Sequence, residues 1–184
     1  MVGKKLVISL DFDGVIADCG ELKRQIASEI SGKPVELEHM SSDRVRAGQT
    51  PLTLEEWNNV REKVYFDPTS IERMQPVEGS IIAINAWLDE GHLVKVVTAR
   101  MGQMREDAVR WLMSHGIDIP VIGAGSRMTK VPHLEGSDIF VDDDPNHVTE
   151  ASAICAAYFF KWPYNDAPED INSITSLAQI TIDR

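Results

Sequence analysis

Short runs of apolar, often β-branched residues recur along the chain and predict buried strands. The first, over residues 5–10, reads K-L-V-I-S-L and ends at the charged turn D-F-D-G. Similar runs are Leu93–Thr98, Ile119–Ile122, Asp138–Val141 and Cys155–Phe160. A short apolar run without strict polar alternation is typical of a strand buried on both faces, as in parallel sheets.

Helical patterns lie between these strands. Ser80 is placed as the N-cap of I-I-A-I-N-A-W-L-D-E, a pattern that ends at Gly91. Residues Arg105–His115 carry apolar side chains at helical spacing and end at Gly116. The alternation of strand and helix predicts a doubly wound α/β fold, in which helices cover both faces of a parallel sheet.

The segment 18–77 interrupts that alternation. It contains two charged helical patterns, Glu21–Ile30 and Leu54–Tyr65, and no run that predicts a strand. We therefore predict a small helical cap over residues 18–77, inserted after the first strand into a core domain formed by residues 1–17 and 78–184. The length of 184 residues allows one full domain with such an insertion, but not two large domains.

Composition and charge limit the classes of function. Hydrophobic residues make up 43% of the chain and charged residues 26%, which is typical of a globular core rather than of disorder. The 18 basic and 29 acidic residues give a net charge of -11, which argues against a protein that coats nucleic acid. A small phosphorylated ligand remains compatible, because a metal ion and a few cations in a pocket can overcome the mean field.

The cysteines and the apolar segments indicate in which cellular compartment the protein lies. Cys19 and Cys155 have no second cysteine or histidine at zinc-ligand spacing, and we interpret both as free thiols in a reducing compartment. The apolar stretch Leu6–Leu10 is too short for a signal peptide, and no segment approaches the roughly 20 apolar residues of a membrane span. We expect a cytoplasmic protein without a membrane partner, and the sequence predicts no oligomeric state.

Acidic residues follow the first and the fourth predicted strands. Asp11 and Asp13 come directly after the first, and Asp142, Asp143 and Asp144 come after the fourth. Open α/β sheets bind ligands just beyond the carboxyl ends of their strands. Neighbouring carboxylates repel each other unless a proton or a cation separates them, and Mg²⁺ prefers oxygen ligands. D-x-D-G alone could be a solvated turn, but two acidic clusters at one edge favour a metal site.

Candidate phosphate ligands lie at the same predicted edge. Thr98 closes the second strand, and its hydroxyl and the following backbone N–H, that of Ala99, could hold phosphate oxygens. Lys130 is the single lysine between Thr98 and Asp142 and could supply a fixed positive charge. Each residue alone is more often a turn residue or a solvated lysine. The ordered set of elements at strand ends is more specific than any one of them.

This set resembles the haloacid dehalogenase-like (HAD) phosphohydrolases. Their four motifs are D-x-D-x, a strand-ending Ser or Thr, a Lys or Arg, and a strand-ending acidic pair, and the match here runs from Leu6 to Pro145. Within that superfamily, D-F-D-G-V-I-A-D, the segment 76–79 and V-D-D-D-P are most similar to the 5′(3′)-deoxyribonucleotidase family. The resemblance implies a Mg²⁺-dependent phosphomonoesterase that acts on a (deoxy)nucleoside monophosphate.

The resemblance also implies a role for each motif residue. Asp11 would be the nucleophile that forms an aspartyl-phosphate, and Asp13 would be the general acid and then the general base. Mg²⁺ would be held by Asp11, by the Asp13 main-chain carbonyl and by either Asp142 or Asp143, a choice that the sequence leaves open. The residues implied to hold the phosphate are Thr98, Ala99 and Lys130.

The predicted cap and two departures from the family bear on the substrate. The large aromatic residues Trp57, Tyr65 and Phe66 could stack on a nucleobase, although such residues more often form a core. The deoxyribonucleotidases have an aromatic residue where this chain has Cys19, and T-S-P where it has T-A-R at residues 98–100. These differences leave open a phosphatase for a sugar phosphate or for a nucleic-acid terminal phosphate.

A phospho-receiver switch domain is the alternative from a non-enzyme class. Receivers also combine an acidic pair, a threonine and a lysine around Mg²⁺, but their lysine comes last, whereas Lys130 precedes the second acidic cluster here. A helical insertion also has no place in that fold. The five histidines show no triad or metal-ligand spacing, and we assign none of them to catalysis.

Overall fold

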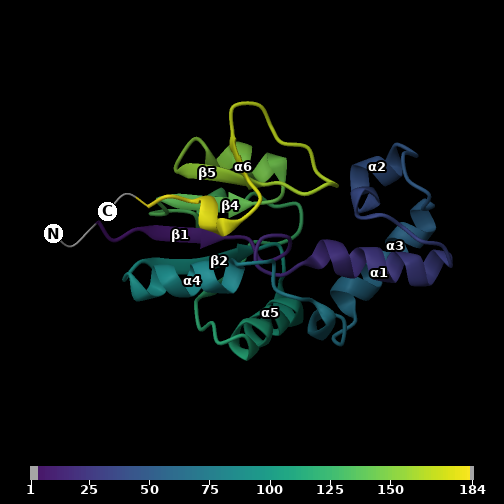
Figure 1. Ribbon diagram of the computed structural model, residues 1–184, viewed down its shortest axis with the longest axis horizontal. Helices are drawn as coiled ribbons and strands as arrows, with labels where there is room; N and C mark the ends of the chain where they lie inside the picture. Colours follow the sequence, from purple (N-terminus) through teal and green to yellow (C-terminus); the bar gives the residue numbers. More distant parts are fainter. Residues whose placement is uncertain (1–3, 183–184) are drawn as a thin grey trace.

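A sheet of six strands forms the centre of the molecule. The computed structural model describes residues 4–182 (Figure 1). The strands are β1 Val7–Leu10, β2 Leu93–Thr98, β3 Val121–Gly123, β4 Ile139–Asp142, β5 Ala156–Phe160 and β6 Asn172–Ile174. Their order is β3-β2-β1-β4-β5-β6, and every neighbouring pair is parallel. The predicted parallel sheet is confirmed, with β1 in its interior.

Side chains alternate between the two faces of this sheet. On β4, Ile139 and Val141 belong to one hydrophobic core, whereas Phe140 belongs to a second core on the opposite face. Helices α4 and α5 contribute to the first core and α6 contributes to the second. Their bounds are α4 Ser80–Asp89, α5 Gly102–Ser114 and α6 Pro145–Ala151. Helices therefore cover both faces, as expected for a doubly wound fold.

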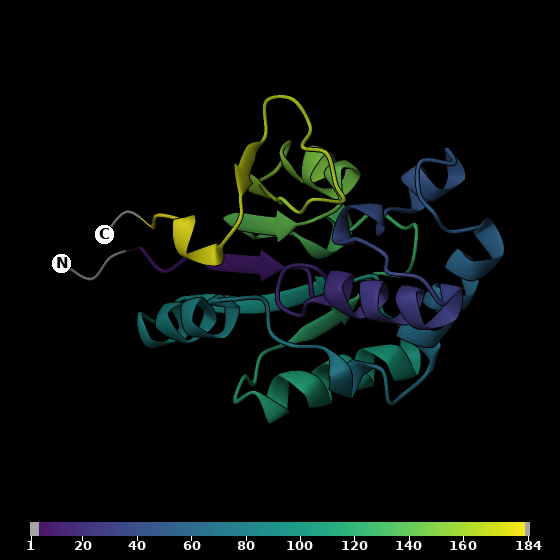
Figure 2. The same cartoon turned by 45° about the vertical axis from the view of Figure 1, so that its right-hand side comes forward.

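The chain between β1 and α4 is helical. Its elements are α1 Cys19–Ser31, α2 Ser42–Arg46, α3 Leu54–Phe66 and short 3₁₀ helices at Leu37–His39 and Ile71–Arg73. Figures 1 and 2 show α1, α2 and α3 grouped beyond the carboxyl ends of the strands. The Asp18 N–H donates to the Gln75 carbonyl at 2.8 Å, so the chain enters and leaves this segment side by side. The division into a core domain and a cap domain stays a prediction.

Two helix starts differ from the sequence expectations. Ser80 is not an N-cap, because its buried hydroxyl donates to the Ile16 carbonyl at 3.1 Å. The N-cap is Gly79, whose φ of 77° is left-handed, and Ser80 is the first helical residue. Helix α5 begins at Gly102 rather than at Arg105.

Two further elements have no counterpart among the sequence expectations. Helix α6 starts with Asp144 as N-cap and Pro145 in its first turn, a pairing that signals a helix start. Strand β6 has a single buried residue, Ile174, and therefore lacks an apolar run. Further 3₁₀ helices are Val131–His133 and Leu177–Gln179. Within residues 4–182, no helix combines the length and the apolar character needed to cross a membrane.

Candidate active site

The register of the central strands places two carboxylates side by side. Leu10 of β1 lies opposite Val141 of β4, and the Asp11 N–H continues this ladder by donating to the Val141 carbonyl at 2.8 Å. Asp142, the next residue of β4, therefore lies beside Asp11 at the carboxyl edge. Asp11 is 7% exposed and Asp142 is fully buried. The edge of the sheet thus holds two neighbouring acids that are shielded from water.

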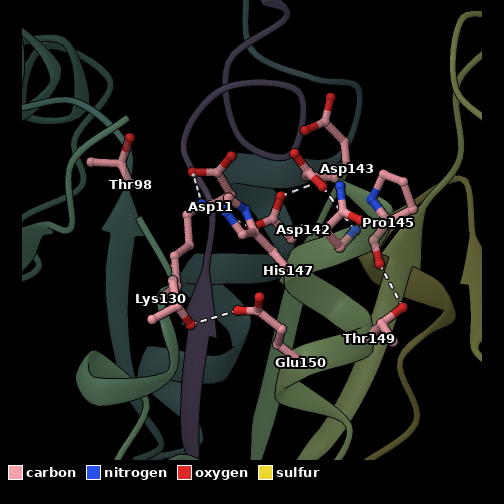
Figure 3. Close-up of polar contacts among 12 residues, drawn as sticks. Asp11, Thr98, Lys130, Asp142, Asp143, Pro145, His147, Thr149 and Glu150 are labelled. Atoms are coloured by element: carbon pink, nitrogen blue, oxygen red, sulfur yellow. Dashed lines mark hydrogen bonds and ion pairs between the residues drawn. The ribbon is translucent and has the colours of Figure 1, made fainter. Parts of the chain in front are cut away.

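Lys130 lies between these two acids. Its Nζ is 2.8 Å from Asp142 Oδ2 and 2.8 Å from Asp11 Oδ1. Figure 3 shows the three side chains pointing toward one another. Burial opposes the charge of Lys130, but the two carboxylates raise its pKa above the ordinary value. Lys130 is therefore a buried cation held between the two carboxylates.

One oxygen of Asp11 is incompletely satisfied. Asp11 Oδ1 is buried, and its contact with Lys130 has the distance of an ion pair but not the alignment of a hydrogen bond, so this oxygen accepts none from the described residues. Burial, together with Asp142 and Asp13, raises the pKa of Asp11, and Lys130 opposes this shift. A buried carboxylate with a free acceptor position is suited to binding a cation.

Three carboxylates can reach one metal ion. Asp11, Asp142 and Asp143 each offer an oxygen, and these oxygens lie within 4.8 Å of one another. Burial and the neighbouring acids Asp142 and Asp11 raise the pKa of Asp143, as expected where like charges meet without a cation. An all-oxygen donor set fits a hard divalent cation. Asp144 is not part of this group, and its carboxylate accepts the Asn146 N–H as the cap of α6.

Asp143 is bonded by one neighbour, Tyr164, and needs the space that another, Gly14, leaves free. The Tyr164 hydroxyl donates to Asp143 Oδ2 at 3.1 Å. A Cβ at Gly14 would lie 2.3 Å from the same oxygen, and Gly14 has a φ of +79°. The glycine of the D-F-D-G turn is therefore required both by the backbone conformation and by the approach of Asp143.

Asp13 is paired with Arg100, a residue without a role in the predictions from the sequence. Arg100 Nε and Nη2 each donate to one Asp13 carboxylate oxygen, both at 2.8 Å. The side chains are 3% and 15% exposed, respectively. Burial would raise the pKa of Asp13, but the Arg100 guanidinium outweighs this effect and lowers it below the ordinary value. The structure therefore holds Asp13 as a paired carboxylate.

The two phosphate ligands predicted at the end of β2, Thr98 and Ala99, differ in position. Ala99 lines the cavity next to the carboxylates. Thr98 is fully buried, and its hydroxyl accepts the Arg100 N–H at 3.2 Å. Figure 3 shows Thr98 at the end of β2, to one side of the acidic cluster. The phosphate-binding roles of both residues stay predictions.

A cavity of about 280 Å³ joins the sheet edge to the helical segment. Its volume lies near the lower end of the ~300–1,000 Å³ typical of small-molecule sites. Trp57, Tyr65 and Phe66, the predicted substrate-reading residues, all line it. Trp57 is only 4% exposed and donates its Nε1–H to Ser42 Oγ at 3.2 Å, whereas Phe66 is 71% exposed. The lining residues contributed by the segment are Cys19, Lys23, Ser42, Trp57, Arg61, Tyr65 and Phe66.

Besides Arg100, two residues that contact the acidic cluster, His147 and Tyr164, were not predicted from the sequence. His147 lines the cavity, and its Nδ1 lies 3.2 Å from Asp142 Oδ2. Burial lowers the pKa of His147, but the bond to Asp142 outweighs this and raises it. The D-P start of α6 was the available signal, since it places His147 in the first turns after the acidic cluster. Nothing near Tyr164 in the sequence indicates its contact with Asp143.

Comparison with known proteins identifies the family. Residues 5–182 match the family described as "5′ nucleotidase, deoxy (Pyrimidine), cytosolic type C protein". The chain belongs to this nucleotidase family. It is therefore a phosphoric monoester hydrolase, and the membership decides against the phospho-receiver alternative.

Related proteins agree with that membership. A curated protein of Chlorobaculum tepidum named "Putative 5′(3′)-deoxyribonucleotidase" is 29% identical over 164 residues, which are 82% of this chain and 75% of the relative. The predicted resemblance to the HAD phosphohydrolases and their deoxyribonucleotidases is confirmed.

Solved structures share the fold. A haloacid dehalogenase-like hydrolase of Streptococcus pneumoniae has a TM-score of 0.62 at 14% identity and covers 92% of this chain and 93% of its own. A HAD-superfamily hydrolase of Geobacter sulfurreducens has a TM-score of 0.62 at 18% identity, with 96% and 95% covered. At these identities the likeness concerns the fold alone.

Proposed function

We propose that this protein is a Mg²⁺-dependent 5′-nucleotidase of the cytoplasm, which hydrolyses small (deoxy)nucleoside monophosphates through an aspartyl-phosphate on Asp11. One observation carries the proposal. Asp11, Asp142 and Asp143 offer oxygens within 4.8 Å of one another, and Lys130 lies beside the first two. This set combines a nucleophile, a divalent cation site and a fixed positive charge in one small cavity. The family and the name of the curated relative support a nucleotide as substrate.

The reaction divides into two displacements. Asp13 enters the first step in its protonated form. An Asp11 oxygen attacks phosphorus, the bond to the ester oxygen breaks, and the departing oxygen takes the proton from Asp13. Water then attacks the phosphorus of the aspartyl-phosphate and gives a proton back to Asp13, which releases inorganic phosphate and restores Asp11. Lys130, the Ala99 N–H and the Thr98 hydroxyl are the proposed ligands of the phosphate oxygens.

Mg²⁺ would offset the repulsion between the Asp11 carboxylate and the phosphate dianion. The proposed ligands are Asp11, the main-chain carbonyl of Asp13 and the carboxylate of Asp143. Asp143 is preferred over Asp142 because Asp142 already contacts Lys130, His147 and the Asp144 N–H. Asp142 would then hold Lys130 in place rather than bind the metal directly.

The helices of residues 18–77 are proposed as a cap that reads the leaving group. Tyr65 and Phe66 line the cavity from α3 and offer rings to a nucleobase. Cys19 favours a second candidate, because it lines the cavity where the deoxyribonucleotidases carry an aromatic residue. That candidate is a phosphatase for a sugar phosphate or for a nucleic-acid terminal phosphate.

A turnover screen tests the proposal. Purified protein is incubated with 5′ and 3′ nucleoside monophosphates of both sugars, with sugar phosphates and with a 5′-phosphorylated oligonucleotide, each with Mg²⁺, with Ca²⁺ or with EDTA. We expect a nucleoside monophosphate to be hydrolysed fastest, poor support by the larger Ca²⁺, and no turnover in EDTA or by Asp11→Asn. Full activity in EDTA contradicts the mechanism. Preference for a sugar phosphate or an oligonucleotide selects the second candidate.

A further inference from the structure

Arg100, in the loop after β2, is fixed by several contacts. Both prongs of its guanidinium are occupied by Asp13, with Nε and Nη2 each 2.8 Å from a carboxylate oxygen. Such a two-pronged pair fixes the plane of the carboxylate as well as its position. The Asp13 side chain therefore has one orientation while the pair is intact.

Two aromatic rings from different parts of the molecule contact the same guanidinium. Arg100 Cζ lies 5.2 Å from the ring centroid of Phe12 and 5.4 Å from that of Tyr65. Phe12 is fully buried in the D-F-D-G turn, whereas Tyr65 belongs to α3 in the helical segment. Both distances are within the roughly 6 Å of a cation–π contact. Arg100 thus connects the sheet edge to the segment that covers it.

This arrangement bears on how Asp13 can act. A general acid must carry a proton on one oxygen and direct it at the leaving group, and small misplacements of a catalytic group cost large factors in rate. Arg100 bonds both Asp13 oxygens here and favours the unprotonated form, so one of the two bonds opens when Asp13 takes up the proton, and the other keeps the carboxyl group in place. Asp13 lies in a turn beyond β1, and Arg100 is the residue that fixes its carboxylate through two hydrogen bonds. Tyr65 in turn restricts Arg100 from the side of the helical segment.

We propose that Arg100 is the positioning residue of the general acid Asp13, and that Tyr65 couples this position to the seating of helix α3. A change in the placement of residues 18–77 over the cavity would then also change the orientation of Asp13. The inference rests on the proposed function for the role of Asp13. It gives Arg100, which follows the second motif, a role of its own. The loss of rate on replacing Arg100 should depend on the leaving group and not on phosphate binding.

Two esters of similar size separate these effects. Benzyl phosphate has an alkoxide leaving group that needs a proton, whereas the phenolate of p-nitrophenyl phosphate leaves unaided. Arg100→Lys keeps the charge but not the two-pronged geometry. We expect kcat/KM to fall at least ~10-fold for benzyl phosphate, a part of the ~10²- to 10⁴-fold contribution of general acid–base catalysis, and to change far less for p-nitrophenyl phosphate.

Arg24→Lys is the matched control. Arg24 also makes a two-pronged pair, with Glu21 at 2.7 Å for both bonds, but on the surface of α1. It should leave kcat/KM unchanged for both esters. Equal losses on both esters in Arg100→Lys would overturn the inference, because they would indicate a role in phosphate binding or in folding.

A double-mutant cycle tests the link to Asp13. In an Asp13→Asn background, Arg100→Lys should cost less than about threefold on benzyl phosphate, because the group that it positions no longer acts. If the double variant loses kcat/KM by the product of the two single losses, the two residues act independently, which contradicts the inference. If wild-type protein with Mg²⁺ hydrolyses neither these esters nor any nucleoside monophosphate, the proposed function fails, and the role of Arg100 fails with it.

Tyr65 variants test the coupling and replace Arg100→Lys if that variant does not fold. Tyr65→Leu removes the ring and should lower the ratio of benzyl to p-nitrophenyl kcat/KM, whereas Tyr65→Phe keeps the ring and should preserve this ratio. An unchanged ratio in Tyr65→Leu overturns the coupling through Tyr65. Thermal unfolding of each variant, followed by circular dichroism, verifies that a folded protein is compared.

Discussion

The carboxyl edge of the sheet and the helical segment 18–77 bury different kinds of side chain. At the edge, Lys130 is 2% exposed and lies between two buried carboxylates, Asp11 and Asp142. In the segment, α1 and α3 bury apolar residues such as Ile26 and Val60. Burial of apolar surface stabilises a fold, whereas buried ion pairs contribute little net stability and are costly when one partner is removed.

The difference indicates what each region is built for. The edge concentrates charge where a metal ion and a phosphate would bind, at a cost in stability that the rest of the core must offset. The segment is packed like an ordinary core and presents only a few side chains to the cavity. We therefore expect changes at the edge to remove the chemistry, and changes in the segment to alter stability and substrate ranking.

The largest effect is expected for Lys130→Met. This change leaves Asp11 and Asp142 buried without their cation, which should destabilise the fold by about 3–5 kcal/mol. Activity should fall at least ~10²- to 10³-fold, as for the loss of one oxyanion donor. Urea unfolding and a phosphatase assay measure both effects.

Lys95→Met is the control for this change. Lys95 lies on β2 and donates to the His133 carbonyl at 3.0 Å. Because this partner is neutral, Lys95→Met should cost only about 1 kcal/mol of stability. If Lys130→Met destabilises the fold no more than Lys95→Met does, the stability of the buried carboxylates Asp11 and Asp142 does not depend on the Lys130 charge.

A large effect on stability and on substrate ranking is expected in the helical segment. Trp57→Ala removes a ring that is 4% exposed and should cost about 3–5 kcal/mol of stability. It should change the ranking of nucleoside monophosphates more than the hydrolysis of p-nitrophenyl phosphate. Phe66→Ala, at a site that is 71% exposed, should change the ranking while stability stays within about 0.5 kcal/mol. Equal losses on all substrates in the folded variants would show that these residues do not discriminate leaving groups.

Two glycines with left-handed backbones compare the regions directly. Gly32→Ala, at the end of α1, has a φ of +66° and no atom within 4 Å of the new Cβ, so it should cost only the roughly 1–2 kcal/mol of backbone strain. Gly14→Ala, with a φ of +79°, carries the same strain and also displaces Asp143. Activity should therefore be lost in Gly14→Ala and retained in Gly32→Ala. Retained activity in both would remove Asp143 from the proposed metal site.

The smallest effect is expected at the opposite end of the sheet. Asp138 precedes β4 and accepts hydrogen bonds from Lys4 Nζ at 2.7 Å and from the Val7 N–H at 2.9 Å. These bonds lower its pKa, so the stability that they contribute is present above the ordinary aspartate pKa of about 4 and is lost as pH falls through the lowered value. Asp138→Asn should cost no more than about 1 kcal/mol at pH 7.

Urea unfolding of wild type and Asp138→Asn between pH 2 and pH 7 measures this dependence. The difference between the two proteins should shrink as pH falls below about 4. A difference that grows toward low pH would contradict the sign of the shift.

The residues at strand ends could be predicted because strand direction alone brings them together. Asp11 and Asp142 follow apolar runs that pair in parallel, so their meeting depends on the same pattern that predicts the strands. Lys130 has no such local signal, and only its place in an ordered set of motifs indicated it.

Other contacts depend on loops whose course no local pattern determines. Asp13 and Arg100 are 87 residues apart, and the sequence showed Arg100 only as a departure from the family motif. Tyr164 reaches Asp143 from the segment after β5, which carries no periodic pattern. Ser80 illustrates a different failure, because a tertiary bond to Ile16 competes with the local role of an N-cap.

The central claim is that Asp11 carries the phosphoryl group and Asp13 carries the proton. It is tested most directly by rapid-quench trapping of a protein-bound acyl phosphate with p-nitrophenyl phosphate and Mg²⁺. In Asp13→Asn, the intermediate should form and accumulate, and borohydride reduction followed by peptide mass spectrometry should map it to Asp11. In Asp11→Asn, no acyl phosphate should form. An acyl phosphate that persists in Asp11→Asn and is absent from Asp13→Asn would show that the two roles are reversed.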